Sequence, residues 1–184
     1  EMDRGRVRVF GGSNWTAARL DAANEYAQSK GRAGLSLVSN NFSLARMEQP
    51  VWDGCLASST DDFRDWHTRT GVALFAWSAQ ARGFFLDWES QPLSAARHAA
   101  DPTIEEMYRV WGSPENLERR NRATELAKRK KTSAQHIALA YVLHQPFPTA
   151  ALIGPRTPMQ LADSVAACDI ALSVDEVSWL DLSS

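Results

Sequence analysis

Short apolar runs alternate along the chain with longer segments in which apolar residues recur every three or four positions. The apolar runs cover residues 7–10, 35–39, 72–77 and 150–153. Buried parallel strands are short and apolar, whereas amphipathic helices show the longer period, so the pattern predicts four strands separated by helices. The expected helices cover residues 16–30, 61–70, 114–130, 133–143 and 158–166, and a last one begins near Val174.

Three of these helices begin with a capping-box pattern, in which a hydroxyl residue is followed three positions later by Gln or Glu. The pairs are Thr132 with Gln135, Thr157 with Gln160, and Ser173 with Glu176. The hydroxyl accepts a bond from the third helical amide, and the longer side chain returns to the amide of the cap. These patterns therefore predict where the three helices start.

Two segments lack either period. Residues 45–60 are predicted to form a loop because they contain Pro50, Gly54 and a Ser-Ser-Thr cluster. Residues 86–114 are predicted to be an irregular insertion or loop that becomes partly helical. The length of 184 residues suits a single domain with a real core, so we take 1–184 as one domain.

Strands that alternate with helices predict an α/β fold with a parallel sheet. Periodicity alone allows an open doubly wound sheet or part of a (β/α)8 TIM barrel. A whole barrel takes about 250 residues, so the chain would supply about half of one. The opening residues 1–5 have the character of a last helical turn with a glycine cap, so we expect the sequence to begin at the end of an element, as a fragment does.

Composition excludes several classes of partner. The net charge is −2, and no apolar run approaches the roughly 20 residues of a membrane span, so we expect neither nucleic acid nor membrane as a partner. Cys55 and Cys168 stand in no metal-binding or CxxC pattern and are predicted to be free thiols of a cytoplasmic protein. Of the four histidines only His136 and His144 have a spacing to consider, and eight positions are more typical of a helix than of a metal site, so no metal site is predicted.

Candidate chemistry lies where the predicted strands end, because both architectures bind ligands outside the carboxyl ends of the strands. The four turns are Gly11-Gly12-Ser13-Asn14, Ser39-Asn40-Asn41, Trp77-Ser78-Ala79-Gln80 and Gly154-Pro155-Arg156-Thr157. They offer neutral hydrogen-bonding groups, one aromatic ring and one arginine. Such groups bind a ligand more readily than they transfer protons.

Each turn has more than one interpretation. Arg156 before a helix start suits a phosphate, yet it could equally cap exposed backbone. Trp77 could stack on a flat ring or serve only as a packing residue. Ser13 and Asn14 could bind a ligand or cap the following helix.

Together the turns resemble the C-terminal half of an aldo-keto reductase, a family of NADPH-dependent (β/α)8 barrels. GRVRVFGGSNW is similar to the fifth strand of the family and LFAWSAQARGFF to the seventh strand with its turn. TSAQHIALAYVLHQP resembles the helix before the eighth strand, and ALIGPRTPMQLADS resembles the eighth strand with its cofactor segment. The resemblance covers nearly the whole chain in the family's order.

The resemblance implies roles in binding NADP. Ser13, Asn14 and Ser39 would hold the nicotinamide carboxamide, and Trp77 would stack on its ring. Ser78 and the backbone through Gln80 and Arg82 would face the pyrophosphate. The remaining positions serve the adenosine end: Gly154, Arg156 and Thr157 for the 2′-phosphate, and Gln160 and Asp163 near the adenine.

The chain departs from the family pattern at several of these positions. Ser39 replaces the usual glutamine, Ala79 the usual proline and Ser164 the usual asparagine. No residue matches the family's catalytic Asp, Tyr, Lys and His, which come from the first four strands. Tyr26, Tyr108 and Tyr141 all fall in predicted helices, so no catalytic residue is assigned in this chain.

The resemblance therefore implies an NADPH-dependent oxidoreductase that reduces aldehydes or ketones by hydride transfer, with this chain as its cofactor-binding half. Its expected partners are a small carbonyl substrate and either a missing N-terminal half-barrel or another copy of the chain. Two alternatives remain: a non-catalytic, nucleotide-binding or self-associating half-barrel, and an unrelated α/β binding domain with similar turns. The isolated chain is expected to be inactive.

Overall fold

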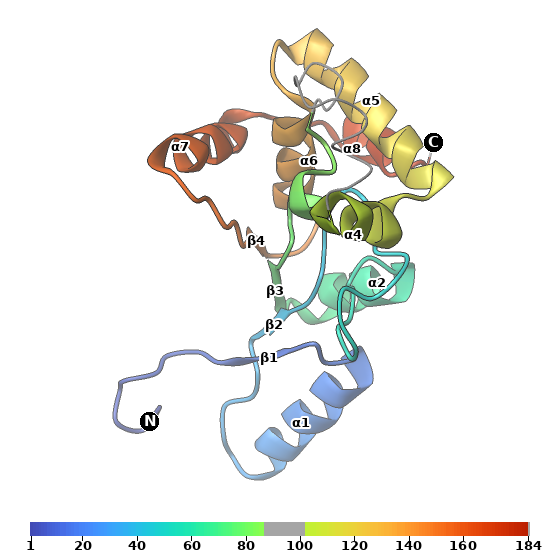
Figure 1. The fold of residues 1–184 in the computed structure, drawn as a ribbon. Coiled ribbons are helices and arrows are strands. Elements are labelled where there is room, and N and C mark those ends of the chain that lie inside the picture. Colours follow the sequence, from blue (N-terminus) through green and yellow to red (C-terminus); the bar gives the residue numbers. More distant parts are fainter. Residues whose placement is uncertain (87–101, 184) are drawn as a thin grey trace.

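Four short parallel strands form one sheet in the computed structural model, which describes residues 1–86 and 102–183. The strands are β1 (Gly11–Ser13), β2 (Leu37–Ser39), β3 (Ala73–Ala76) and β4 (Thr149–Ala151). They lie in the order β1-β2-β3-β4, and each pairs in parallel with the next (Figure 1). The predicted parallel α/β architecture is therefore confirmed.

The strand order decides between the two architectures that periodicity left open. A doubly wound sheet reverses its strand order at a switch point, so consecutive strands there are not all neighbours. A barrel instead adds each strand beside the previous one. The order β1-β2-β3-β4 runs in one direction without a reversal, as a barrel requires.

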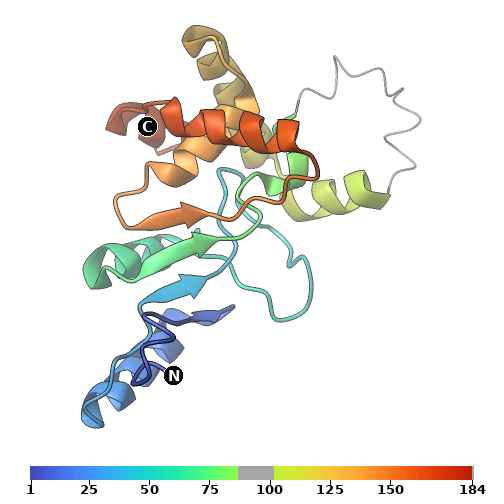
Figure 2. The ribbon, with the colours of Figure 1, turned by 90° about the vertical axis from the view of Figure 1, so that its left-hand side faces the viewer.

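The described helices are α1 (Ala17–Ser29), α2 (Asp61–Thr70), α4 (Pro102–Trp111), α5 (Pro114–Lys130), α6 (Ala134–Leu143), α7 (Pro158–Ala166) and α8 (Val174–Leu180). Short 3₁₀ turns, η1 (Ala81–Gly83) and η2 (Ala167–Asp169), complete the elements. In Figure 2 the strand arrows stand in front of α1 and α2 and point the same way. The loop 45–60 and α4 lie beyond the strand tips (Figure 2).

The prediction of a first strand over residues 7–10 is wrong by several residues. The strand begins at Gly11, although Ser36 N already donates to Phe10 O at 3.1 Å. Val9 is 60% exposed, so the apolar residues before Gly11 are not buried by this part of the chain. The other three strands lie within or one residue from their predicted ranges, but are shorter.

Of the three predicted capping boxes, one forms completely and one forms by half. Ser173 and Glu176 form the complete reciprocal box. At α7, Thr157 accepts from Gln160 N, but the Gln160 side chain bonds Arg156 N instead of the cap amide. The box predicted at Thr132 is wrong, because the following Ser133 caps α6 and accepts from His136 N.

The later part of the segment 86–114 is helical, in line with the prediction of a partly helical segment. Residues 87–101 lie outside the described residues, but Pro102–Trp111 forms the helix α4. One side of α4 is buried through Ile104, Met107 and Val110, which belong to the main core. The predicted helical part of the segment therefore lies at residues 102–111, where this apolar stripe gives the helix a surface to pack against.

The two faces of the sheet differ in burial. Val38 and Leu74 are register partners with no exposed surface, and they face the core with Leu20 of α1. Side chains alternate along a strand, so Leu37 and Phe75 point to the opposite face. These two remain half-buried, and Leu152, just after β4, is 43% exposed. The helices thus cover one face, and the partly open face corresponds to a barrel interior.

The buried His67 predicts a pH dependence of stability. Its ring is fully buried between Phe63 and Phe147, and Nδ1 lies 2.7 Å from Val72 O. Burial lowers the pKa of His67 below 6.5, and the Val72 contact opposes this only in part. The unfolded chain therefore binds a proton below about pH 6.5 that the folded chain does not, so stability should fall as the pH drops below about 6.5.

Urea unfolding at several pH values would measure this slope. In the variant His67→Phe the slope below about pH 6.5 should become smaller, whatever its absolute stability. An unchanged slope would mean that His67 is not neutral and buried in the folded state.

No described helix is both long and apolar enough to cross a membrane. Cys55 and Cys168 are free thiols, as predicted, and Cys55 is buried.

Candidate functional site

The turns after β1 and β2 meet at the carboxyl edge of the sheet. Ser13 Oγ and Asn14 N both donate to Ser39 O, each at 3.1 Å, so the three predicted carboxamide residues are adjacent. Asn14 adopts a positive φ of 56°, a conformation that asparagine tolerates better than most residues. Its Oδ1 accepts from Leu56 N at 3.0 Å, so the carbonyl end of this side chain is already used within the protein.

The turn after β3 extends the same edge. Trp77 is half-buried, and its backbone N donates to Asn40 O at 3.1 Å, which ties this turn to the end of β2. Ser78 follows with a positive φ of 52°. Gln80 Nε2 donates to Ser164 Oγ at 3.2 Å, which connects the β3 turn to α7. Arg82 instead pairs with Glu106 of α4 at 3.0 Å, so its guanidinium already has a partner within the protein.

The turn after β4 carries the predicted phosphate group of residues. Gly154, Arg156 and Thr157 are all exposed, and α7 begins directly after them. Within the described residues the Arg156 guanidinium takes part in no ion pair, while its backbone N is bonded by Gln160 Oε1 at 2.7 Å. Pro158 has no amide hydrogen and Gln160 N is capped, so fewer helix amides than expected remain for an anion.

The residues predicted near the adenine are only partly free. Asp163 is exposed, but its carboxylate accepts from His136 Nε2 at 3.0 Å. The Gln160 side chain is also engaged, because its Oε1 accepts from the backbone N of Arg156. The predicted groups therefore line one edge of the sheet from β1 to α7, while Arg82 and Asp163 also have structural partners.

Three side chains at this edge were not assigned from the sequence. Trp52, in the loop 45–60, stacks on Trp77 with ring centroids 4.8 Å apart and an interplanar angle of 27°. Asn40 and Asn41 are fully buried, and the Oδ1 atoms of both lack a partner among the described residues, as does Trp77 Nε1. Asn40 and Asn41 belong to a predicted strand-end turn, and that position was the signal that could have identified them as site residues. Nothing in the local sequence pattern indicates such a role for Trp52.

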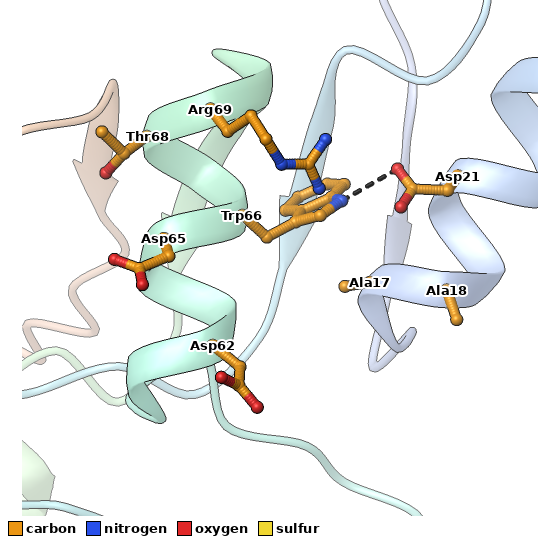
Figure 3. Close-up of a pocket in the computed structure, with 8 residues that line it drawn as sticks. All are labelled: Ala17, Ala18, Asp21, Asp62, Asp65, Trp66, Thr68 and Arg69. Carbon is orange, nitrogen blue, oxygen red and sulfur yellow. Dashed lines mark hydrogen bonds between the residues drawn. The ribbon is translucent and has the colours of Figure 1, made fainter.

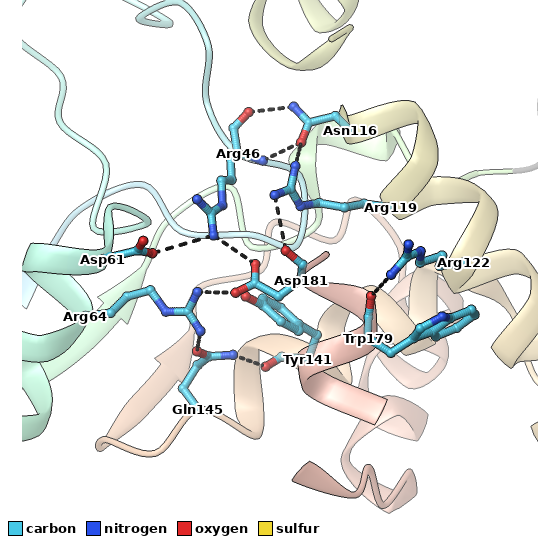
Figure 4. Close-up of polar contacts among 10 residues, drawn as sticks. All are labelled: Arg46, Asp61, Arg64, Asn116, Arg119, Arg122, Tyr141, Gln145, Trp179 and Asp181. Carbon is cyan, nitrogen blue, oxygen red and sulfur yellow. Dashed lines mark hydrogen bonds and ion pairs between the residues drawn. The ribbon is translucent and has the colours of Figure 1, made fainter. Parts of the chain in front are cut away.

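A buried ion network anchors the start of the 45–60 loop. The Asp181 carboxylate, with 5% of its side chain exposed, accepts from Arg46 at 3.2 Å and from Arg64 of α2 (Figure 4). Asn116 of α5 bonds both the backbone N of Arg46, at 2.8 Å, and its backbone O, at 2.7 Å. Residues from the loop, α2, α5 and the end of α8 are thereby joined at one point.

Neighbouring groups complete the network electrostatically. Burial and the Asp181 carboxylate raise the pKa of Tyr141 well above its ordinary value, so this phenol stays protonated. Burial, together with the nearby Arg46 charge, lowers the pKa of Arg119. Because Tyr141 is a buried residue of α6 and does not lie at a strand end, this cluster is structural and not part of the candidate site.

A separate groove of about 590 Å³ lies between α1 and α2, outside the sheet (Figure 3). Asp21, Asp62 and Asp65 line it, and Asp21 accepts from Trp66 Nε1 at 2.8 Å. It is an open surface between two helices and contains none of the predicted site residues. Within residues 1–86 and 102–183, no group of three His, Cys, Asp or Glu side chains could hold a metal ion.

Comparisons with known proteins agree with this geometry. The chain is 27% identical to an uncharacterized oxidoreductase, YrpG, of Bacillus subtilis (strain 168), over 98% of this chain and 50% of the relative. It is 29% identical to a putative aryl-alcohol dehydrogenase, AAD16, of Saccharomyces cerevisiae (strain ATCC 204508 / S288c), over 61% of this chain and 32% of that protein. The chain thus spans about half or less of the length of these relatives.

A solved structure has the same fold. The crystal structure of a thermostable aldo-keto reductase, Tm1743, in complex with the inhibitor epalrestat superposes with a TM-score of 0.66 at 19% identity. The match covers 100% of this chain and 51% of that chain. The model of the aldo/keto reductase family matches residues 2–183, which is nearly the whole sequence. The chain therefore belongs to the aldo/keto reductase family.

Proposed function

We propose that this chain forms strands five to eight of an NADPH-dependent barrel enzyme that reduces aldehydes or ketones by hydride transfer. The observation that carries this proposal is the single edge where the turns after β1, β2, β3 and β4 converge, each with groups suited to a dinucleotide. The oxidoreductase character of the relatives supports the same reaction class. When bound, the cofactor would supply the hydride, and this half of the barrel would hold it.

The side chains fit the two ends of NADPH differently. At the nicotinamide end, Ser13 and Asn14 would bond the carboxamide, with the Asn14 amide donating because its Oδ1 is already used. Trp77 presents a ring at the same edge for stacking. The backbone between Ser78 and Arg82 would line the pyrophosphate, held by the Gln80 bond to α7.

At the adenosine end, Arg156 offers the best group for a 2′-phosphate. Its guanidinium is exposed, takes part in no ion pair within the described residues, and stands directly before a helix start. A guanidinium bonds two phosphate oxygens at once, which favours NADPH over NADH. Gly154 and Thr157 would flank the phosphate. The Gln160 side chain stabilises the turn by accepting a hydrogen bond from the backbone N of Arg156.

The acid for the reaction would come from elsewhere in the complete barrel. Tyr26 and Tyr108 lie on the exposed surfaces of α1 and α4, and Tyr141 is a buried residue of α6 with a raised pKa. These are all three tyrosines of the sequence, and none follows a strand. A reductase needs a proton donor at the carbonyl oxygen, so strands one to four would provide it.

The two cysteines bear on where the protein acts. The free thiols support a reducing, cytoplasmic location.

Turnover measurements test this division of roles. The enzyme with its complete barrel is expected to oxidise NADPH only when an aldehyde or ketone is present. Residues 1–184 alone are expected to give no turnover, because the proton donor is absent. Turnover by the isolated chain would place the acid within it and make Tyr108→Phe the first variant to examine. A complete barrel that binds a nucleotide but reduces no carbonyl would favour the non-catalytic alternative.

A further inference from the structure

The loop 45–60 places an unassigned aromatic ring at the same edge of the sheet. Leu56 N donates to Asn14 Oδ1 at 3.0 Å, beside the end of β1, and Leu56 O accepts from Asn41 N at 2.8 Å, beside the end of β2. The Trp52 ring, four residues earlier, stacks on Trp77 after β3. The loop therefore crosses the ends of three strands and brings Trp52 to the candidate nicotinamide position.

Contacts on the other side hold this loop in a defined position. Arg109 of α4 donates to Pro50 O at 3.0 Å, and Glu48 N donates to Val110 O at 2.9 Å. Within the loop, Cys55 N bonds Trp52 O at 3.2 Å, and the Cys55 side chain is 5% exposed. These anchors flank Trp52 on both sides along the chain, so its ring is presented in a fixed place before any ligand arrives.

The Trp52 ring has a stacked neighbour and a large exposed surface. Trp77 packs against one face of the ring, and 48% of Trp52 stays exposed. A large exposed aromatic surface that is rigidly held beside a cofactor site is suited to a flat, aromatic partner, because π-systems prefer offset-stacked or edge-to-face contacts. A saturated ring of equal size gains the hydrophobic part of such a contact but not the aromatic part.

We propose that Trp52 determines substrate specificity by contacting the ring of an aromatic aldehyde or ketone at the carboxyl ends of the strands. The inference rests on the proposed reductase function and adds the substrate class to it. Trp77 serves the cofactor, and Trp52 extends that aromatic surface toward the substrate. Trp52 takes no part in the transfer of the hydride or the proton.

The test compares two aldehydes of similar size in the complete enzyme, benzaldehyde and cyclohexanecarbaldehyde. Wild type is expected to have a KM for benzaldehyde that is about three- to tenfold lower, in line with the strength of aromatic pairs. Trp52→Ala should abolish this preference, while Trp52→Phe should keep most of it. The affinity for NADPH, measured by calorimetry, should change less than about twofold in both variants.

Tyr26→Ala is the matched control, since Tyr26 is also an exposed aromatic residue, at 67%, but lies on α1 away from the strand ends. It should leave both KM values unchanged. A preference that survives in Trp52→Ala would overturn the proposal. So would an equal loss for both aldehydes together with weaker NADPH binding, which would make Trp52 only a support for Trp77.

Calorimetric binding of benzyl alcohol and cyclohexylmethanol with saturating NADP⁺ separates this inference from the proposed function. Turnover is not needed for that measurement. An enzyme that reduces no aldehyde or ketone would contradict the proposed function, and binding of benzyl alcohol that depends on Trp52 would still support the aromatic contact. Reduction of both aldehydes with equal KM values in wild type would instead contradict the aromatic contact alone.

Discussion

Replacing Asp181 by alanine is expected to lower the free energy of unfolding by about 3 kcal/mol. The carboxylate is 95% buried, given its 5% exposed side chain, and it faces the guanidinium groups of Arg46 and Arg64. Removing one partner of a buried ion pair leaves the other charge uncompensated, which costs about 3–5 kcal/mol. The two arginines keep 32% and 19% of their side chains exposed, so water compensates them in part and the loss falls at the lower end.

The exposed Asp61 supplies a matched control because it approaches the same Arg46 side chain, at 3.8 Å, with 84% of its own side chain exposed. Asp61→Ala should cost less than about 1 kcal/mol, as exposed ion pairs do. Urea unfolding followed by circular dichroism measures both variants. Equal and small effects would mean that the network in Figure 4 does not hold the C-terminal helix to the loop start.

Replacing Arg156 by alanine in the complete enzyme is expected to weaken NADPH binding about ten- to a hundredfold, or roughly 1.5–3 kcal/mol. Under the proposed function its guanidinium clamps the 2′-phosphate through charge-assisted bonds. NADH lacks that phosphate, so its affinity should change little. Arg156→Lys should restore only part of the loss, because an ammonium group cannot bond two oxygens in a planar fork.

Arg32→Ala provides the control for a lost surface charge, since Arg32 is also exposed but stands before β2, at the amino ends of the strands. It should alter neither affinity. Calorimetric titration with both cofactors measures the effect in each variant. Equal losses of NADPH and NADH affinity in Arg156→Ala would remove Arg156 from the phosphate site and would leave it the role of capping exposed backbone.

Much of the architecture could be predicted because it depends on local chemistry. The ranges of α2, α5 and α7 follow from the period of their apolar residues and from their ends, such as Gly71 at a positive φ of 68° after α2. Capping is a contact between residues three positions apart, so Ser173 and Glu176 needed no tertiary information. At Thr132 the same rule fails because the adjacent Ser133 offers an equivalent hydroxyl.

Other features depend on partners far away in the chain. Residues 7–10 have a strand-like pattern, yet a strand requires a neighbour for its backbone bonds, and the pairing with β2 begins only at Gly11. The segment 86–114 was predicted only as partly helical, and the bounds of α4 depend on the core surface that its apolar stripe covers.

The candidate site also combines features that local sequence determines with features that depend on distant contacts. Its strand-end turns are determined by the sequence itself, because small, polar and glycine residues after an apolar run mark a turn in any α/β fold. The tertiary structure decided the strand order, the stack of Trp52 on Trp77, and the pairing of Arg82 and Asp163 with structural partners. These are contacts across 24 or more positions, which no local period encodes, since only the packing of the helices and the register of the sheet bring those residues together.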